Sequence, residues 1–180
     1  IRDRYIHSSY EVELQGWVGD DISNICPHMY ADADFAGDLE TQRSTSGMHY
    51  AFEGPNTRFP VAAQSKRQGC VSCSTPEAEL IAAFVALKNT LLPNLDIWEI
   101  LFGPCSPVFH EDNTPMIRCL KTGRNPTMKH ITRTHRVPIA WMHEQIPDPK
   151  LRYKAIDDGH PSDYAHEKFV NDVILKWGVV

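Results

Sequence analysis

Three aspartates lie within seven residues of one another, at Asp32, Asp34 and Asp38. Asp32 and Asp34 are two residues apart, so on a β-strand their side chains point to the same face. Two neighbouring carboxylates are costly to keep ionised unless a cation or a proton lies between them. The segment is therefore a candidate metal site, and the alternative is a solvated strand end with an Asx turn before Gly37.

Three further acids are placed where they could join Asp32. Glu79 lies one turn into a predicted helix, Asp112 ends a short predicted strand, and Asp163 opens the last predicted helix. Ligands of open α/β sheets collect at the carboxyl ends of strands, near the point where the strand order reverses. Four carboxylates there would need Mg²⁺ or Mn²⁺, which prefer oxygen ligands. Two such ions about 3.5–4 Å apart cleave phosphodiesters by in-line attack of water.

Strand and helix patterns alternate along the chain in a way that could bring these acids together. Period-2 and apolar patterns predict five strands, at residues 25–35, 48–53, 58–65, 107–112 and 151–156. We expect strands one to three to form an antiparallel meander, with strands four and five parallel to the first. The result is a five-stranded mixed sheet of the α/β class, with helices on both faces.

The predicted helices cover residues 74–92, 95–102, 113–120, 134–146 and 162–170. The first begins at Ser74, with a hydroxyl cap and a proline in its first turn, and Pro93 should end or kink it. The length predicts a single domain. We expect residues 1–24 to form a lead-in segment that packs on its edge, and residues 25–180 to form the domain itself.

Composition places the chain among ordinary globular proteins, with 42% hydrophobic and 23% charged residues. No apolar run approaches the ~18–20 residues of a membrane span, and the start of the chain lacks the apolar core of a signal peptide. The first residue is not Met, which indicates a processed product or an excised fragment. We expect an intracellular location and no membrane partner.

Five cysteines without regular spacing also favour a reducing setting. Cys70 and Cys73 form a CxxC pair, but a zinc site needs a second pair of ligands at comparable spacing. Cys26 and His28 are too loosely patterned to be that pair. The CxxC is therefore interpreted as two small residues of a loop.

A basic strip follows the fourth strand. Residues 113–143 contain no acid, although the net charge of the whole chain is −5. The basic residues of this segment are Arg118, Lys121, Arg124, Lys129, Arg133 and Arg136. An acidic centre beside a basic strip is typical of a polyanion held against metal ions; a solvated helix face is the alternative.

Several blocks of the sequence resemble one known family. Residues 31–38 and 43–47 (ADADFAGD and RSTSG) are similar to the SDADWAGD…RKSTSG block of the ribonuclease H domains of copia-type LTR retrotransposons. Residues 65–68 and 74–82 (SKRQ and STPEAELIA) resemble their SKKQ…SSTEAEYIA. Residues 110–113 (HEDN) stand where CDN stands, and residues 129–131 repeat KHI. The blocks occur in the family's order from about Tyr30 to Phe169.

The resemblance implies a ribonuclease H-like three-layer fold and endonucleolytic hydrolysis of the RNA strand of RNA–DNA hybrids, leaving 3′-hydroxyl and 5′-phosphate ends. It implies two Mg²⁺ ions, with Mn²⁺ as a substitute, and an adjoining reverse transcriptase domain. Carried over, the family's acidic tetrad falls on Asp32, Glu79, Asp112 and Asp163. Asp34 and Glu77 are then neighbours of the ligands.

The chain departs from the family in its last block. The family has a sequence like EEQLADILTK, whereas residues 160–168 are HPSDYAHEK, so Asp163 is kept but its surroundings are not. His160 precedes it by three residues. Cellular ribonucleases H place a mobile histidine before their last helix, for product release or proton transfer, and His160 is a candidate for that role. The alternative is an ordinary histidine at the start of a helix.

Polar and basic side chains near the predicted metal site would hold the substrate. The candidates are Ser44, Ser46, Lys66, Arg67, Asn113, Arg118 and Lys129. Short polar groups can sense 2′-hydroxyls across a wide minor groove, and long basic ones can hold phosphates. Two alternatives stay open: an inactive ribonuclease H-like domain with a structural or nucleic-acid-binding role, and another nuclease or integrase-like enzyme of the same fold.

Overall fold

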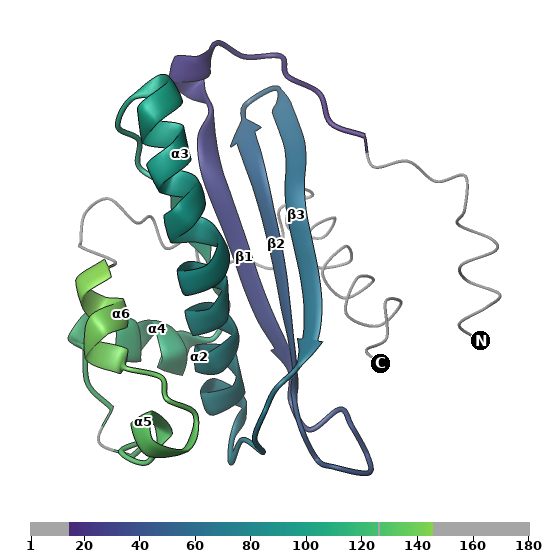
Figure 1. Cartoon of the computed structure of the whole chain (residues 1–180), viewed down its shortest axis with the longest axis vertical. Helices are drawn as coiled ribbons and strands as arrows, with labels where there is room; N and C mark the ends of the chain where they lie inside the picture. Colours follow the sequence, from purple (N-terminus) through teal and green to yellow (C-terminus); the bar gives the residue numbers. More distant parts are fainter. Residues whose placement is uncertain (1–14, 126, 146–180) are drawn as a thin grey trace, which may run out of the picture.

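A four-stranded mixed sheet forms the centre of the computed structural model, which describes residues 15–125 and 127–145 (Figure 1). The strands are β1 (Cys26–Asp34), β2 (Thr45–Gly54), β3 (Thr57–Arg67) and β4 (Val108–His110), in the order β3-β2-β1-β4. The helical elements are η1 (Ile22–Asn24), α2 (Thr75–Ala86), η2 (Leu87–Leu91), α3 (Leu92–Phe102), α4 (Thr114–Thr122), α5 (Ile131–Thr134) and α6 (Ile139–Gln145).

The central strand β1 is antiparallel to β2 and parallel to β4, and β2 is antiparallel to β3. These pairings confirm the predicted meander and the predicted adjacency of the first and fourth strands. Tyr30 of β1 pairs with His110 of β4. Asp32 lies two residues after Tyr30, and Asp112 lies two residues after His110. The parallel register therefore brings these two acids to the same edge of the sheet.

The outer strand β3 has an additional partner from the beginning of the described chain. The Trp17 N–H donates to the Arg58 carbonyl at 2.9 Å, and the Arg58 N–H donates to the Trp17 carbonyl at 3.0 Å. Such a bridge satisfies backbone groups that an edge strand would otherwise leave to solvent. The described part of the predicted lead-in segment thus lies along the edge of the domain, and residues 1–14 are outside the described part.

One continuous helix runs for 28 residues from Thr75 to Phe102 and contains α2, η2 and α3. The expectation that Pro93 separates two helices was therefore wrong. The turn before it is a π turn, in which the Leu92 N–H bonds to the Leu87 carbonyl five residues earlier. The Asn94 side chain adds a bond to the Thr90 carbonyl at 2.7 Å. The wider turn accommodates a ring that would clash with a regular α-helical turn.

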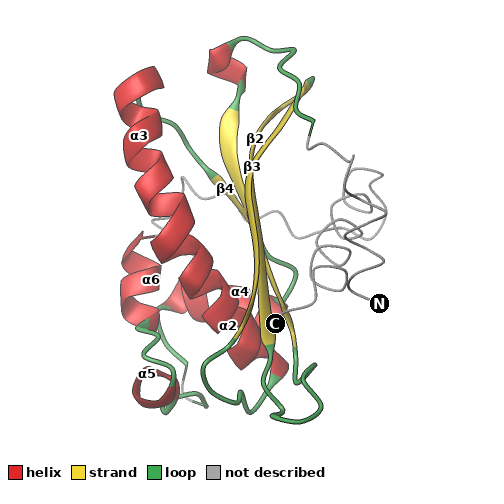
Figure 2. Ribbon diagram, turned by 45° about the vertical axis from the view of Figure 1, so that its right-hand side comes forward, coloured by secondary structure: helices red, strands yellow, loops and turns green. Residues whose placement is uncertain are grey.

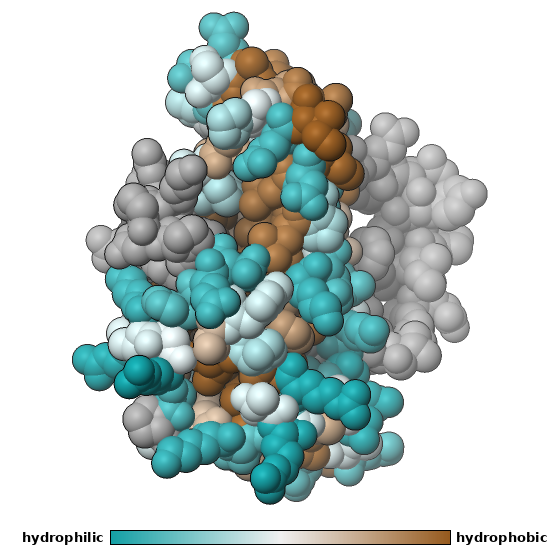
Figure 3. Space-filling view, turned by 60° about the vertical axis from the view of Figure 1, so that its left-hand side comes forward, coloured by the Kyte–Doolittle hydropathy of each residue, from teal (hydrophilic) through white to brown (hydrophobic). Residues whose placement is uncertain are grey.

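By length and composition alone this helix could cross a membrane, a test that the core helix of a soluble protein also passes. Its first half, α2, is largely buried and packs on β1 and β2. Its second half is different, because four apolar side chains of α3 are more than half exposed: Ile97, Ile100, Leu101 and Phe102. Figure 3 shows the hydrophobic surface at the end of the molecule that holds α3.

Small residues let α2 approach β1 closely. Ala33 of β1 and Ala78 and Ala82 of α2 form a separate buried cluster. The main core lies beside it and extends under α4 and α6, with Met29, Tyr50, Leu80, Phe109, Met116, Leu120 and Met142 among its members. Because alanine fills little space, the start of α2 comes within reach of the end of β1.

Of the two helices predicted in the described segment after β4, one forms as predicted and the other is shorter. α4 agrees well: the Asn113 side chain accepts from the Met116 N–H at 3.0 Å, and Gly123 ends the helix with φ 65°. The helix predicted at 134–146 begins only at Ile139. Arg136 has a positive φ of 56°, and a residue that precedes a proline, here Pro138, is disfavoured in the helical conformation.

The described helices α2, α3 and α6 lie on one side of the sheet in an edge-on view (Figure 2). α2 packs on the sheet, α4 packs on α2, and α6 packs on α4. The predicted fifth strand at 151–156 and the predicted last helix at 162–170 lie outside the described residues. The five-stranded sheet and the helices on both faces therefore stay predictions.

Candidate active site

Asp32 and Glu79 form the centre of the candidate site, at the end of β1 and in the first half of α2. Glu79 is 4% exposed and Asp32 is partly buried. The two carboxyl groups share a hydrogen bond. Burial, followed by the negative charge of Asp112, raises the pKa of Asp32 above its ordinary value. This bond lowers the pKa of Asp32 and raises that of Glu79, so the Glu79 carboxyl group donates it and the Asp32 carboxylate accepts it.

The environment of Glu79 is unusual for a carboxyl group. Burial raises its pKa to about 10, and the nearby acids Asp32, Glu111 and Asp112 add to the effect. A carboxyl group with such a pKa is protonated at neutral pH unless a cation replaces the proton. Four acids thus converge from β1, α2 and the segment after β4.

Glu111 is the acid that the sequence analysis missed. It is 1% exposed, and burial raises the pKa of its carboxyl group to about 8, with Asp112 and Asp32 as further causes. Its Oε1 accepts from the Asn113 N–H at 2.9 Å. The available signal was its position directly after a strand, beside Asp112, but sequence alone does not tell which of two consecutive acids faces inward.

Asp112 lies at the exposed side of this group. Its charge acts on Asp32, Glu79 and Glu111, which places it near all three. The next residue, Asn113, uses its side chain to cap α4. The cap holds the turn between β4 and α4, and so holds both acids at the end of β4.

These residues fit a hard divalent cation. The donors are carboxylate oxygens, the ligands that Mg²⁺ and Mn²⁺ prefer. Within the described part of the chain, Glu79 Oε2 and Glu111 Oε2 are buried and have no hydrogen-bond partner. A buried oxygen without a partner is costly, and a bound cation would remove that cost. Asp32, Glu79 and Asp112 are the residues that would hold the ions, with Glu111 as an additional donor.

The serines of the turn region have structural partners. Ser44 is fully buried, and its hydroxyl accepts from the Ala36 N–H at 3.1 Å. Ser46 is 9% exposed and accepts from the Gln68 side-chain amide at 2.9 Å. The predicted substrate contact through Ser44 is therefore wrong for its side chain, because the hydroxyl is enclosed and holds the turn after β1.

Two other acids of the first cluster lie apart from the site. Asp34 is exposed, and Asp38 pairs with Arg67 at 2.6 Å. That guanidinium, together with bonds from Thr41, holds the pKa of Asp38 well below its ordinary value. Arg67 thus stabilises the turn after β1, whereas its neighbour Lys66 is exposed at the end of β3. Asp163 and His160 lie outside the described residues.

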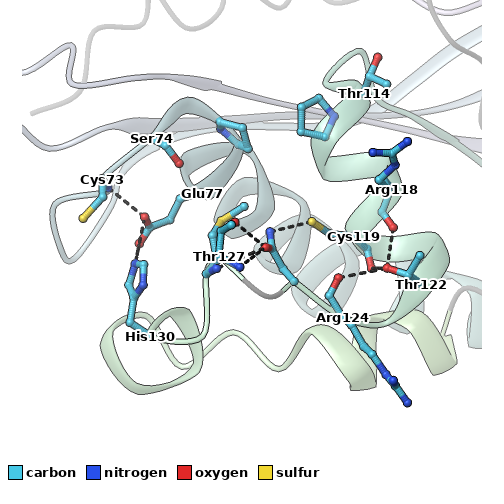
Figure 4. A pocket seen from close by; sticks show the side chains of 14 residues that line it. Cys73, Ser74, Glu77, Thr114, Arg118, Cys119, Thr122, Arg124, Thr127 and His130 are labelled. Carbon is cyan, nitrogen blue, oxygen red and sulfur yellow. Dashed lines mark hydrogen bonds and ion pairs between the residues drawn. The ribbon is translucent and has the colours of Figure 1, made fainter.

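Part of the basic strip borders a cleft of about 910 Å³ between the start of α2 and α4 (Figure 4). Arg118 and Arg124 line it, together with Thr114 beside the Asn113 cap. Lys129 is exposed and precedes His130, another lining residue. Arg118 and Arg124 thus lie on the rim of a cleft that begins two residues from Asp112, which favours a substrate contact for this part of the strip over a purely solvated helix face.

Known proteins were compared with the chain in three ways. No protein-family model matches it. A Retrovirus-related Pol polyprotein from transposon TNT 1-94 of Nicotiana tabacum is 31% identical over 136 residues, which is 74% of this chain. The chain spans about 10% of the length of that curated relative.

Solved structures agree on the fold. RNase H1 from the halophilic archaeon Halobacterium salinarum NRC-1 has a TM-score of 0.51 at 14% identity, covering 84% of this chain and 98% of its own. LC11-RNase H1, solved in complex with an RNA/DNA hybrid, has a TM-score of 0.50 at 16% identity, with the same coverage of both chains. Sequence and fold together identify the chain as a ribonuclease H-like domain related to retrotransposon Pol polyproteins.

Proposed function

We propose that the chain is a metal-dependent ribonuclease H that hydrolyses the RNA strand of RNA–DNA hybrids and leaves 3′-hydroxyl and 5′-phosphate ends. The observation that carries the proposal is the convergence of Asp32, Glu79, Glu111 and Asp112 at the ends of β1 and β4. The pKa values of Glu79 and Glu111 are raised to about 10 and about 8. Acids in such an unfavourable environment add nothing to the stability of a protein that binds no cation there, and they are typical of functional sites.

Two Mg²⁺ ions, or Mn²⁺ in their place, would supply Lewis-acid activation of the phosphodiester and of the attacking water. Asp32, Glu79 and Asp112 would hold the ions, and we propose Asp163 as a further ligand. Glu79 has a second task, because its carboxyl group must release the proton shared with Asp32 before it can bind a cation. Metal binding is then coupled to proton release, and it strengthens as pH rises.

The chain's own polar groups orient the substrate. The Asn113 cap fixes the segment beside Asp112, and the cleft bordered by Arg118 and Arg124 is positioned to take a phosphate backbone. A solved protein with this fold was captured with an RNA/DNA hybrid, which supports the substrate class. Ser46, Lys66 and Lys129 remain candidate contacts, and His160 remains a candidate for product release or proton transfer.

The relationship to a Pol polyprotein supports a wider proposal about context. We infer that the domain belongs to a longer polyprotein in which it adjoins a reverse transcriptase, and that it acts in the cytoplasm or in a retroelement particle. Within this proposal, residues 1–24 form the connection from the preceding domain.

The test is a cleavage assay with matched substrates. A labelled RNA–DNA hybrid, double-stranded RNA and double-stranded DNA are each incubated with the full chain in Mg²⁺, in Mn²⁺ and in a chelator. We expect cleavage of the hybrid's RNA strand only, in either metal, and none in chelator or in Asp32→Asn.

The competing function is a ribonuclease H-like domain that binds nucleic acid without cutting it. Binding of the hybrid with no cleavage in any metal would establish that function and refute the proposal. Cleavage of double-stranded DNA at a comparable rate would instead favour a nuclease of another kind on the same fold.

A further inference from the structure

A group of metal-ligating side chains lies outside the carboxylate site, at one end of the cleft in Figure 4. The ligand atoms of Cys73, Glu77 and His130 all lie within 4.8 Å of one another. Figure 4 shows these three together at the end of the cleft opposite Arg118 and Arg124. They come from the loop before α2, the first turn of α2 and the start of α5.

Glu77 is the centre of this group. Its side chain is 1% exposed, and its Oε2 accepts from the Cys73 N–H at 3.0 Å. His130 Nε2 lies 3.3 Å from both of its oxygens. His135 Nε2 lies 2.9 Å from Oε1, and the His135 side chain is 4% exposed. Two imidazoles and a thiol-bearing residue thus surround one buried carboxylate.

The contact of His135 points to something other than a simple hydrogen bond. Despite the short distance to Glu77, His135 Nε2 has no hydrogen bond of acceptable geometry to any residue of the described part. A buried ring nitrogen that faces a carboxylate without such a bond is costly. A cation held between the nitrogen and the carboxylate would satisfy both groups.

The spacing of these residues agrees with that interpretation. His130 and His135 form H-x₄-H, a spacing found in structural zinc sites. The histidine pair is too distant in sequence to be linked to the CxxC without the fold. The structure brings the two segments together: the Cys70 thiol lies 3.6 Å from the carbonyl of Thr134, beside His135.

We propose that Cys73, Glu77, His130 and His135 bind a zinc ion. Sulfur, nitrogen and carboxylate oxygen are all ligands that Zn²⁺ accepts, whereas the carboxylates around Asp32 suit Mg²⁺. On binding, the Cys73 thiol releases its proton to become a thiolate, and the two histidines bind as neutral imidazoles. The proposal does not depend on the nuclease function.

The group needs only a modest adjustment to bind zinc. Tetrahedral ligands at Zn–S and Zn–N distances of about 2.3 and 2.0 Å lie roughly 3.3–3.8 Å apart. The separations among Cys73, Glu77 and His130, up to 4.8 Å, must therefore shorten by about 1 Å, and the 2.9 Å between His135 Nε2 and Glu77 Oε1 must lengthen slightly. Cys73 is exposed and the His130 side chain is 44% exposed, so both are free to move by that amount.

The zinc would join the segment 124–135 to α2. That segment carries Arg124, Lys129 and Arg133 of the basic strip, and Glu77 is two residues from Glu79. A zinc ion there would hold the strip at a constant position relative to the carboxylate site. It would have a structural role and would leave no open coordination position for substrate.

The experiment measures zinc in the full 180-residue chain. Metal content is determined after dialysis, and zinc affinity by competition with a chromogenic chelator. The thiol ligand is detected as a thiolate-to-cobalt charge-transfer band after replacement by Co²⁺. We expect about one zinc ion per chain, and an affinity at least about 100-fold weaker in Cys73→Ser and in His130→Gln.

Two variants serve as controls. Cys70→Ser makes the same chemical change three residues away and should keep both the zinc and the cobalt band. Asp32→Asn alters the carboxylate site and should keep them too, so that failure of the zinc proposal and failure of the nuclease proposal are distinguishable. Equal zinc affinity in all five proteins, no zinc in the unmodified chain, or loss of zinc only in Cys70→Ser would each overturn the assignment.

Discussion

Glu77 and Glu79 are the same residue type on the same helix, and both are almost completely buried. At 3.6 residues per turn they point about 200° apart around α2. Glu79 is buried among other acids, and burial first and these acids next raise the pKa of its carboxyl group to about 10. Glu77 meets the Cys73 N–H and the rings of His130 and His135.

This difference shows that burial by itself does not decide what a carboxyl group does. Around Glu77 the protein places the Cys73 N–H and two imidazoles, so the carboxylate links the loop before α2 to α5. Around Glu79 such N–H and imidazole groups are missing, and the protein retains an unfavourable group of acids. Such local instability is typical of sites that bind a charged ligand, because the ligand's charge offsets it.

The largest expected effect is on catalysis. Asp32→Asn should lower hybrid cleavage by at least about 10³-fold, because the amide cannot replace an anionic metal ligand. Asp34→Asn is the matched control: its side chain is exposed two residues away, and cleavage should change by less than about 3-fold. The measurement is the single-turnover rate in Mg²⁺; equal losses in both variants would contradict the assignment of Asp32.

The two glutamates should respond to the same substitution with opposite sign. In chelator, Glu77→Gln should lower the free energy of unfolding by about 2–4 kcal/mol, since two imidazoles and an N–H lose their buried anion. Glu79→Gln should raise it by about 1–3 kcal/mol, since Glu79, with its pKa of about 10, must take up a proton on folding at pH 8 and a neutral amide does not. Urea unfolding of both variants at pH 8 measures this directly. A loss of stability in both would show that Glu79 contributes to the fold as Glu77 does.

The pH dependence of stability should also report on the acidic site. The folded-state pKa values of Glu79 and Glu111, about 10 and about 8, lie above the ordinary value of 4.5. The folded protein therefore binds more protons than the unfolded one, and the free energy of unfolding falls as pH rises. The stabilisation is complete below about pH 4.5 and declines through pH 8 to 10.

Saturating Mg²⁺ should flatten that decline, because the cation binds the ionised carboxylates that the protons had neutralised. The measurement is urea unfolding from pH 5 to 9, with Mg²⁺ and with a chelator, using Glu79→Gln as the variant with the smaller slope. A slope that Mg²⁺ leaves unchanged would argue against a cation at this site.

The smallest expected effect concerns the basic strip. Arg118→Ala should weaken hybrid binding a few-fold at low salt and reduce the slope of log affinity against log salt by about 1, for the loss of one phosphate contact. Lys88→Ala is the control, because Lys88 lies on the π turn and does not line the cleft. Equal slopes for Arg118→Ala and the unmodified protein would indicate that Arg118 only faces solvent.

Local patterns were sufficient to predict the strands of the meander, the start of α2 at Ser74 and the end of α4 at Gly123. They failed at Pro93, where a π turn accommodates the proline ring and the helix continues. They also failed at residues 134–138, where the positive φ of Arg136 and the presence of Pro138 prevent a helix from starting before Ile139. In both cases proline disfavours a regular α-helix, as expected, but the neighbouring turns decided whether the helix continued or started later.

The sequence by itself predicted an acidic site, because Asp32, Glu79 and Asp112 follow from the family blocks and from their positions on predicted elements. It did not reveal Glu111, since only packing decides which of two adjacent acids is buried. Nor did it connect Cys73 with His130 and His135, which are distant in sequence. Only the tertiary structure decided those contacts, because burial and the electrostatic surroundings of a side chain depend on which distant segments pack against it.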